Sequence, residues 1–136
     1  MPQENVEKLR RGLEAFNSTG TIDTSFLAED FEAHQASSIV DTDGVFRGRD
    51  ALRDSLRELQ EVFDELRLEP ERFIEASGGE IVVLLRACGR GRGSGLELDN
   101  HIAWLCTFRN GEAVRLVVYE EPAEALEAVG LSEEAR

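Results

Sequence analysis

The chain has 136 residues, of which 41% are hydrophobic, and its 28 acidic and 15 basic residues give a formal net charge of −13. This length is typical of one domain that buries a core without metal or disulfides, and the acidic excess argues against binding to nucleic-acid phosphates. No stretch has the apolar length of a membrane span and the first residues do not resemble a signal peptide, so we expect a cytoplasmic protein with no membrane contact.

The N-terminal segment has helical periodicity. Its apolar residues recur at intervals of three and four, which predicts an amphipathic helix ending within residues 17–20. These apolar residues are Val6, Leu9, Leu13 and Phe16. A short second helix is expected from Asp23 or Thr24 through Leu27, followed by an extended piece from Phe31 to Ala36.

A third and longer helix is predicted after Asp50, which is well placed as its N-cap. Its apolar face follows the same helical spacing. The residues of this face are Leu52, Leu56, Leu59, Phe63 and Leu66. Between the short extended piece and this helix, residues 37–44 indicate an irregular loop and residues 45–47 a minor strand.

Strand signals dominate from Leu66 onward. Pro70 restricts the first of these strands to a sheet edge or requires a bulge, and residues 77–79 form a turn. The next strand, Ile81 to Cys88, is joined to Leu96 by the glycine-rich residues 89–95, which we interpret as a flexible hairpin loop rather than an RNA-binding segment. Within Leu96 to Tyr119, Asn110 and Gly111 predict a two-residue hairpin turn.

The chain ends in a short predicted helix, with Pro122 at its first position and Gly130 at its C-cap. The order of elements indicates an α+β fold. We expect a cone-shaped, curved antiparallel sheet packed against three N-terminal helices, with the short C-terminal helix after it. Residues 1–131 would form a single domain and residues 132–136 a frayed tail.

Four segments resemble the SnoaL-like branch of the nuclear-transport-factor-2-like superfamily. They are QENVEKLRRGLEAFNSTG, AEDFEAHQ, VFRGRDALRDSLREL and RGRGSGLELDNHIAWLCTFRNGEAVRLVVYEEPAEALEAVGL. The resemblance covers nearly the whole chain and implies the cone-like fold, a cavity and a homodimer formed through the sheet face, with Asp99 and His101 at or near that interface. The superfamily includes ketosteroid isomerases, polyketide cyclases, scytalone dehydratase, limonene epoxide hydrolase and non-catalytic binding proteins, so fold alone does not define a reaction.

The isomerase mechanism uses a carboxylate base with an oxyanion hole made by a Tyr and a protonated Asp. The resemblance places the base at Gln35, the Tyr at Leu13 and the Asp at Trp104. Gln35 cannot take a proton, Leu13 can neither donate nor polarise, and Trp104 replaces the Asp, so all three catalytic positions are changed. We therefore do not expect a ketosteroid isomerase of that type.

Two other residues are acid–base candidates. Many SnoaL-like proteins have a His in the short strand, and this chain has His34 there, with an ordinary pKa near neutrality that suits a general base. Glu120 is a weaker candidate that would lie at the cavity mouth. Strand alternation places His34 and Gln35 on opposite faces without indicating which one faces inward.

Alternation also divides the strand that contains Trp104. One face holds Leu98, Asn100, Ile102, Trp104, Cys106 and Phe108, and the other holds Asp99, His101, Ala103, Leu105 and Thr107. Because Trp104 has to be covered, its face is expected to point toward the helices. The predicted ligand-binding residues are Leu13, Phe16, Gln35, Asn100, Ile102, Trp104, Leu116 and Val118.

We therefore expect an apolar cavity that binds a small hydrophobic molecule. One hypothesis is a cofactor-independent isomerase, cyclase, dehydratase or hydrolase with His34 as the acid or base. The alternative is a non-catalytic ligand-binding or accessory protein, and a protein-interaction domain is a third. No cofactor and no metal are expected, because the two histidines are far apart in sequence and the two cysteines are interpreted as buried thiols.

Overall fold

The computed structural model describes residues 2–36 and 45–130. The predicted loop over residues 37–44 and the predicted tail after Leu131 lie outside the described residues. No helix in the described ranges is both long and apolar enough to cross a membrane.

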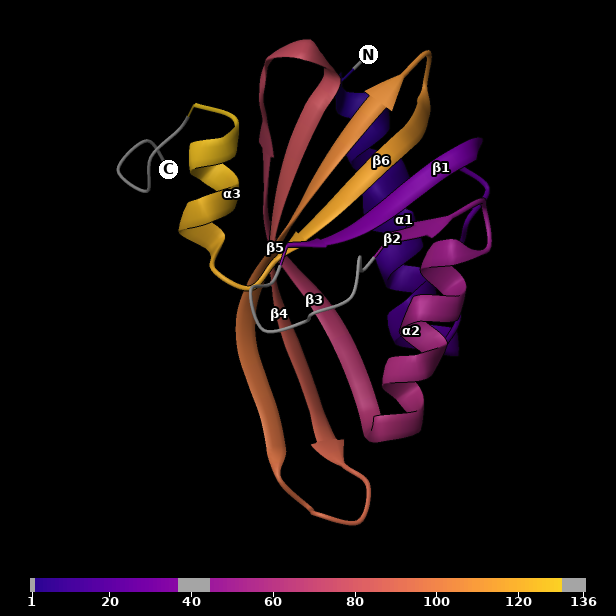
Figure 1. Ribbon diagram of the computed structural model, residues 1–136, viewed down its shortest axis with the longest axis vertical. Helices are drawn as coiled ribbons and strands as arrows, with labels where there is room; N and C mark the ends of the chain where they lie inside the picture. Colours follow the sequence, from indigo (N-terminus) through magenta and orange to yellow (C-terminus); the bar gives the residue numbers. More distant parts are fainter. Residues whose placement is uncertain (1, 37–44, 131–136) are drawn as a thin grey trace.

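Three α-helices and a six-stranded sheet make up the described fold (Figure 1). The sheet order is β2-β1-β6-β5-β4-β3. The elements are α1 (Pro2–Thr19), β1 (Leu27–Ala36), β2 (Val45–Arg47), α2 (Ala51–Val62), β3 (Phe63–Glu75), the 3₁₀ turn η1 (Ser77–Gly79), β4 (Glu80–Gly91), β5 (Glu97–Arg109), β6 (Glu112–Tyr119) and α3 (Pro122–Ala128). The α+β class and the C-terminal helix are confirmed.

The predicted arrangement of three N-terminal helices is wrong. Only α1 precedes the first strand, and α2 follows β2. The residues predicted as a short second helix form a turn instead, in which the Ser25 N–H donates to Asp23 Oδ1 at 2.9 Å and the Leu27 N–H to the Thr24 carbonyl at 3.1 Å. Asp side chains favour such turns because they bond to the backbone two residues on.

The predicted third helix also ends earlier than expected. Helix α2 stops at Val62, and Phe63 is extended, with φ −123° and ψ 132°. Phe63 pairs with Gly91 of β4, and Leu66 is 8% exposed within β3. The spacing of Phe63 and Leu66 fits both a helix and a bulged strand, and pairing with β4 favours the strand.

Strands β3 to β6 are successive antiparallel neighbours, as predicted, and the hairpin turn at Asn110-Gly111 is confirmed. Both turn residues have positive φ, 54° and 81°, which matches the turn type that Asn-Gly favours. The sheet is not purely antiparallel, however, because β1 pairs in parallel with β6. It is a mixed sheet, and it does not close into a cone.

The glycine-rich segment after Cys88 is only partly a loop. Strand β4 continues to Gly91, so the first residues of the segment are paired. Arg92 then holds the hairpin to the end of α2, since its N–H bonds to the Val62 carbonyl at 2.8 Å and its Nε to the Gln60 carbonyl at 3.0 Å. The Arg92 guanidinium also pairs with Asp64 at 2.6 Å.

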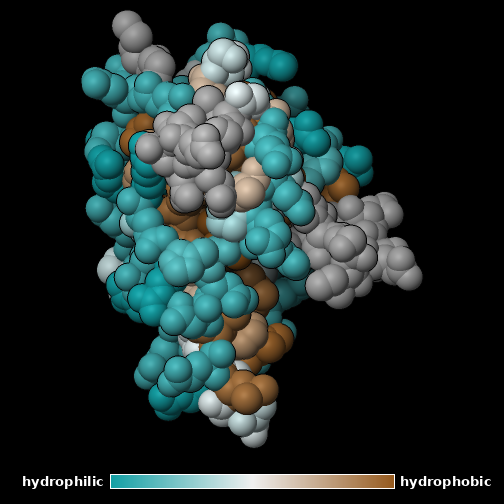
Figure 2. Space-filling model, turned by 90° about the vertical axis from the view of Figure 1, so that its left-hand side faces the viewer, coloured by the Kyte–Doolittle hydropathy of each residue, from teal (hydrophilic) through white to brown (hydrophobic). Residues whose placement is uncertain are grey.

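Two hydrophobic clusters lie on the two faces of the sheet. We call the face covered by α1 and α2 the inner face; its cluster includes Leu13, Phe16 and Trp104. The outer face is covered in part by α3, whose Ala125 and Leu126 are 0% exposed. Figure 2 shows a mainly hydrophilic surface, with apolar residues exposed toward the lower end, where the β4–β5 hairpin lies.

Strand β3 is one edge of the sheet, and α1 closes part of this edge. The Asn17 side chain donates from Nδ2 to the Leu68 carbonyl and accepts the Leu68 N–H at Oδ1, both at 2.8 Å. The Pro70 prediction is confirmed, because β3 is an edge strand with a register shift between Pro70 and Arg72. An edge strand with unpaired backbone groups invites pairing with other chains, and here one side chain occupies both groups of Leu68.

Replacing Asn17 by Ala is expected to lower the free energy of unfolding by about 1–3 kcal/mol, because both Leu68 backbone groups lose their partner. Asn17→Asp keeps an acceptor for the Leu68 N–H but sets a carboxylate oxygen against the Leu68 carbonyl oxygen, so it should also destabilise the fold. Urea unfolding followed by circular dichroism measures both. Wild-type stability in Asn17→Ala would contradict the role of this contact.

Candidate functional site

The inner face carries a continuous row of apolar side chains across the sheet. In the strand ladder, Trp104 of β5 pairs with Val83 of β4 and with Val118 of β6, and Val83 pairs with Phe73 of β3. Directly opposed residues point to the same face. The row therefore brings Trp104 and Val118 together as predicted from alternation.

Six of the eight predicted ligand-binding residues belong to the inner cluster or pack against it. We call these six residues the inner wall; they are Leu13, Phe16, Ile102, Trp104, Leu116 and Val118. Four of them are at most 2% exposed, whereas Ile102 and Val118 are only partly buried. Ile102 and Val118 are therefore the wall residues with the largest solvent-exposed fraction.

The other two predicted ligand-binding residues lie differently. Asn100 is exposed on β5, at the rim beyond Ile102. Gln35 pairs with Val118 in the β1–β6 ladder, but its side chain is outside the described residues. In the isomerase resemblance, residue 35 is the position of the carboxylate base. The pairing of this position with Val118 places it beside the inner wall.

The inner wall offers almost no polar chemistry. Among the described residues, Asn5 is the only polar or charged residue that is buried, so no Asp, Glu, Lys, Arg or His side chain is fully buried on the inner face. Burial raises the pKa of the Cys106 thiol, so this group stays a thiol rather than a nucleophile. Trp104 is the one residue of the inner wall whose side chain carries an N–H donor.

His34 lies on the opposite side of the sheet from Trp104. Its ladder partners are Val45 and Val117, and Val117 belongs to the outer cluster. Its Nε2 is 2.9 Å from Glu32 Oε1, and the second Glu32 oxygen accepts from Arg47 Nε at 3.3 Å. The sheet therefore separates the imidazole from the inner wall.

The His34 and Arg47 contacts hold the pKa of Glu32 below its ordinary value, with the bond to His34 as the larger cause. Glu120, the weaker acid–base candidate, is exposed just after the end of β6. Neither candidate is brought next to Trp104 by the described contacts. Their catalytic roles stay predictions.

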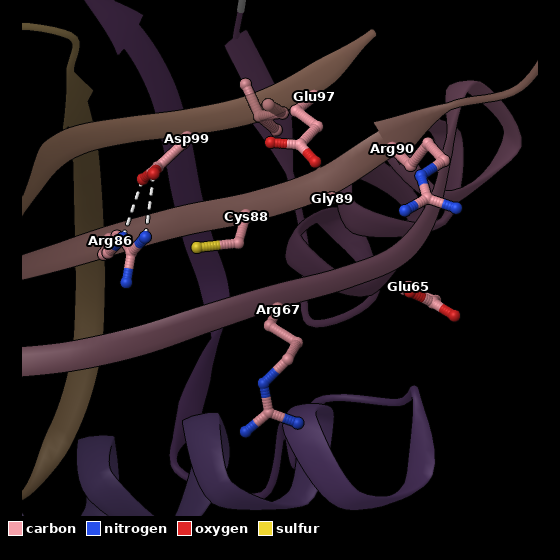
Figure 3. Close-up of a pocket in the computed structure, with 9 residues that line it drawn as sticks. Glu65, Arg67, Arg86, Cys88, Gly89, Arg90, Glu97 and Asp99 are labelled. Carbon is pink, nitrogen blue, oxygen red and sulfur yellow. Dashed lines mark hydrogen bonds and ion pairs between the residues drawn. The ribbon is translucent and has the colours of Figure 1, made fainter. Parts of the chain in front are cut away.

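A hollow of about 270 Å³ lies on the strands β3, β4 and β5 (Figure 3). Its lining residues are Glu65, Arg67, Arg86, Cys88, Gly89, Arg90, Glu97, Leu98 and Asp99. Arg86 and Asp99 form a two-pronged ion pair at 2.7 Å. Burial raises the pKa of Cys88, so the thiol in this hollow is not activated.

This hollow was not predicted, because residues 89–95, which include Arg90, were interpreted as a loop, whereas β4 continues to Gly91. The alternation of Arg86, Cys88 and Arg90 was a usable signal, since it is the period of a strand with one charged face. The two cysteines cannot form a disulfide with each other, because Cys88 pairs with Asp99 and Cys106 with Ile81 at distant points of the β4–β5 ladder.

A larger hollow of about 650 Å³ lies between the C-terminal ends of α1 and α2 and the start of β3. Its lining mixes apolar and charged side chains, among them Phe63, Glu65 and Arg92. Within the described ranges, no three His, Cys, Asp or Glu side chains are grouped as ligands for a metal ion. Phe16 is the inner-wall residue that lines this hollow.

The comparisons with known proteins agree with the fold. The family model of the SnoaL-like domain matches residues 8–116. No functionally curated protein matches the chain.

Solved structures with the same fold include an NTF2-like protein of unknown function from Burkholderia pseudomallei, at 26% identity and a TM-score of 0.71, which covers 93% of this chain and 98% of that one. TerC, co-crystallised with polyporic acid, is 20% identical with a TM-score of 0.71, over 93% and 97% of the two chains. A putative SnoaL-like polyketide cyclase from Jannaschia sp. is 19% identical with a TM-score of 0.71, over 93% and 92%.

Ionised Glu32 is expected to stabilise the fold in a pH-dependent way. Its pKa in the folded protein lies below the ordinary value of 4.5, so the stabilisation is present above that pH and is lost as the pH falls through the lowered pKa. Glu32→Gln should therefore unfold at a lower temperature than the wild type at pH 7, and the gap should narrow below pH 4. Melting curves across pH measure this, with Glu29→Gln, an exposed position on the same strand, as the control.

Proposed function

The chain belongs to the SnoaL-like domain family, and we propose that its inner wall binds a small, neutral and largely apolar molecule beside Trp104. The observation that carries this proposal is the row of apolar side chains on the inner face, in which Trp104 is 2% exposed and its neighbour Val118 only partly buried. Small-molecule sites are lined mainly by hydrophobic and aromatic side chains with a few polar groups that orient the ligand, and the inner wall has this composition.

Among the described residues no Asp, Glu, Lys, Arg or His side chain is buried, since Asn5 is the only buried polar residue, and this argues for a neutral ligand. A charged molecule would lose its hydration there without gaining a partner. The free-energy cost of this desolvation is far larger than the stabilisation from burying apolar surface. Two groups would orient the ligand: the Trp104 indole N–H as a donor and the Asn100 amide at the rim as a donor or acceptor. An oxygen acceptor on the ligand fits the first of these groups.

Binding without chemistry is the form of the proposal that the described residues support best. All three positions of the isomerase mechanism are changed, to Leu13, Gln35 and Trp104. His34, the proposed acid or base of an isomerase, cyclase, dehydratase or hydrolase, has its ladder partner in the outer cluster.

Catalysis by His34 is a second candidate function, and one observation favours it. The 2.9 Å contact with Glu32 orients the imidazole, as a carboxylate does for a general base. A reaction that uses His34 would have to occur on the outer face of β1. The two candidates therefore predict different effects of the same substitutions.

Binding to the inner wall is tested with the neutral apolar dye Nile red. Trp104 is the only tryptophan of the chain, so quenching of its fluorescence by the dye reports contact at the wall. Val118→Gln is expected to weaken dye binding at least several-fold, because it adds a polar group to the apolar wall. Arg115→Gln, on the outer face of the same strand, is the matched control and should bind like the wild type.

The role of the Trp104 N–H is tested by thermal-shift measurements with steroids, aromatic polyketides and terpenoids. Trp104→Phe keeps an apolar ring and loses the donor, so affinity for ligands with a carbonyl oxygen should fall about 2- to 10-fold, as one hydrogen bond predicts. Equal shifts in both proteins would remove Trp104 from the site. Tighter binding of carboxylated analogues than of their neutral parents would contradict a neutral ligand class.

His34→Gln should leave binding at the inner wall unchanged, because the sheet separates the imidazole from Trp104. Nile red titration of His34→Gln and the wild type measures this. Loss of dye binding in a folded His34→Gln protein would place His34 in the ligand site and favour the catalytic hypothesis.

A further inference from the structure

One half of β5 has a strand neighbour on one side only. β5 pairs with β4 from Glu97 to Thr107, but its pairing with β6 covers only Ala103 to Arg109. Within the described ranges, no strand pairs with Glu97–Ile102 on the side away from β4. Figure 1 shows this half of β5 as the outer strand of the lower three-stranded part of the sheet.

The side chains of this free edge are open to solvent. Glu97, Asp99, Asn100 and His101 are exposed, and Leu98 and Ile102 are partly buried. An exposed strand edge presents unpaired N–H and C=O groups that can pair with another strand. The β3 edge, by contrast, has its Leu68 groups occupied by Asn17.

The edge sequence is self-complementary when two copies run antiparallel about Asn100. In this register Asp99 of one copy lies opposite His101 of the second copy, and Leu98 lies opposite Ile102. Opposed residues share a face, so the acid–base pairs meet on the outer face and the apolar pairs on the inner face. A shift by one residue would lose both matches.

Charges that surround the edge support the same register. Arg86 holds the Asp99 carboxylate at 2.7 Å, and His101 Nε2 lies 3.4 Å from Glu71 Oε1. Pairing through Asp99 and His101 would join these two pairs into a row of alternating charge, Arg86, Asp99, His101 and Glu71. This local match matters because a net charge of −13 opposes non-specific association of two copies.

We propose that two copies of this chain pair β5 to β5, antiparallel about Asn100, so that their sheets join edge to edge. This differs from the expected dimer through the sheet face. The apolar centre of the outer face, including Val82, Leu84 and Leu105, already packs against Leu126 of α3. Within the described part of the chain, the β5 edge is an unpaired surface with the better match to a second copy, and the pairing does not depend on ligand binding.

A cysteine at the symmetry axis tests the arrangement directly. Two residues opposed on antiparallel strands have Cα atoms about 4.5–5.5 Å apart, within the range of a disulfide. In a Cys88→Ser background, Asn100→Cys should therefore form an intermolecular disulfide under mild oxidation, seen as a dimer on a non-reducing gel. Glu97→Cys is the matched control, because the two copies of residue 97 lie six residues apart across the axis and should not cross-link.

Light scattering gives the second readout. The wild type should have twice the 15.1 kDa mass of one chain at high concentration. His101→Asp places Asp opposite Asp99 and should shift the protein toward monomer, whereas Gln3→Glu adds the same charge on exposed α1 and should not. Asp99→Arg alone should also be monomeric, and its mixture with His101→Asp should restore the dimer.

Three results would overturn the proposal. The first is a wild type that stays monomeric at every concentration. The second is a dimer in which Asn100→Cys does not cross-link, which would indicate packing through the sheet face. The third is equal cross-linking of Asn100→Cys and Glu97→Cys. Circular dichroism of each variant establishes that it is folded, so that loss of the dimer is not loss of the fold.

Discussion

Burial of the apolar stripe of α1 against the inner face of the sheet is the interaction on which the arrangement depends. Leu9, Leu13 and Phe16 are at most 1% exposed and share one cluster with Trp104 and residues of α2. Each fully buried side chain of this size contributes about 1.5–3 kcal/mol. The helix covers one part of the inner face, and Ile102 and Val118 pack against the same cluster with part of their surface exposed.

The surfaces of the sheet that α1 does not cover are protected by different means. The Asn17 amide occupies backbone groups of β3, and α3 covers apolar residues of the outer face. Charged cross-strand pairs such as Arg86 and Asp99 make other parts of the outer face polar, so that these parts can remain exposed to solvent. The lower half of β5 has charge but no covering element among the described residues, which makes this edge the natural place for a specific contact.

Residue patterns predicted the strands β3 to β6 and the Asn110-Gly111 hairpin, because alternation and turn chemistry are local properties. They failed where a tertiary pairing decided between local options. Phe63 satisfied a helical period and entered a strand when it paired with Gly91. The side of His34 was also undecidable from alternation alone, and only its pairing with Val117 resolves it. The inner wall was predictable because Trp104 had to be buried.

The parallel contact between β1 and β6 has a kinetic consequence. Its partners, such as Leu27 and Ala113, come from nearly opposite ends of the chain. During synthesis β1 can pair with β2 early, but its pairing with β6 must wait until almost the whole chain has been made. Contacts of such long sequence separation slow folding, because the chain loses the entropy of closing the loop before the pairing contributes any stabilisation. Docking of β1 onto β6 is then expected to be a late step, after the β3–β6 antiparallel unit has formed.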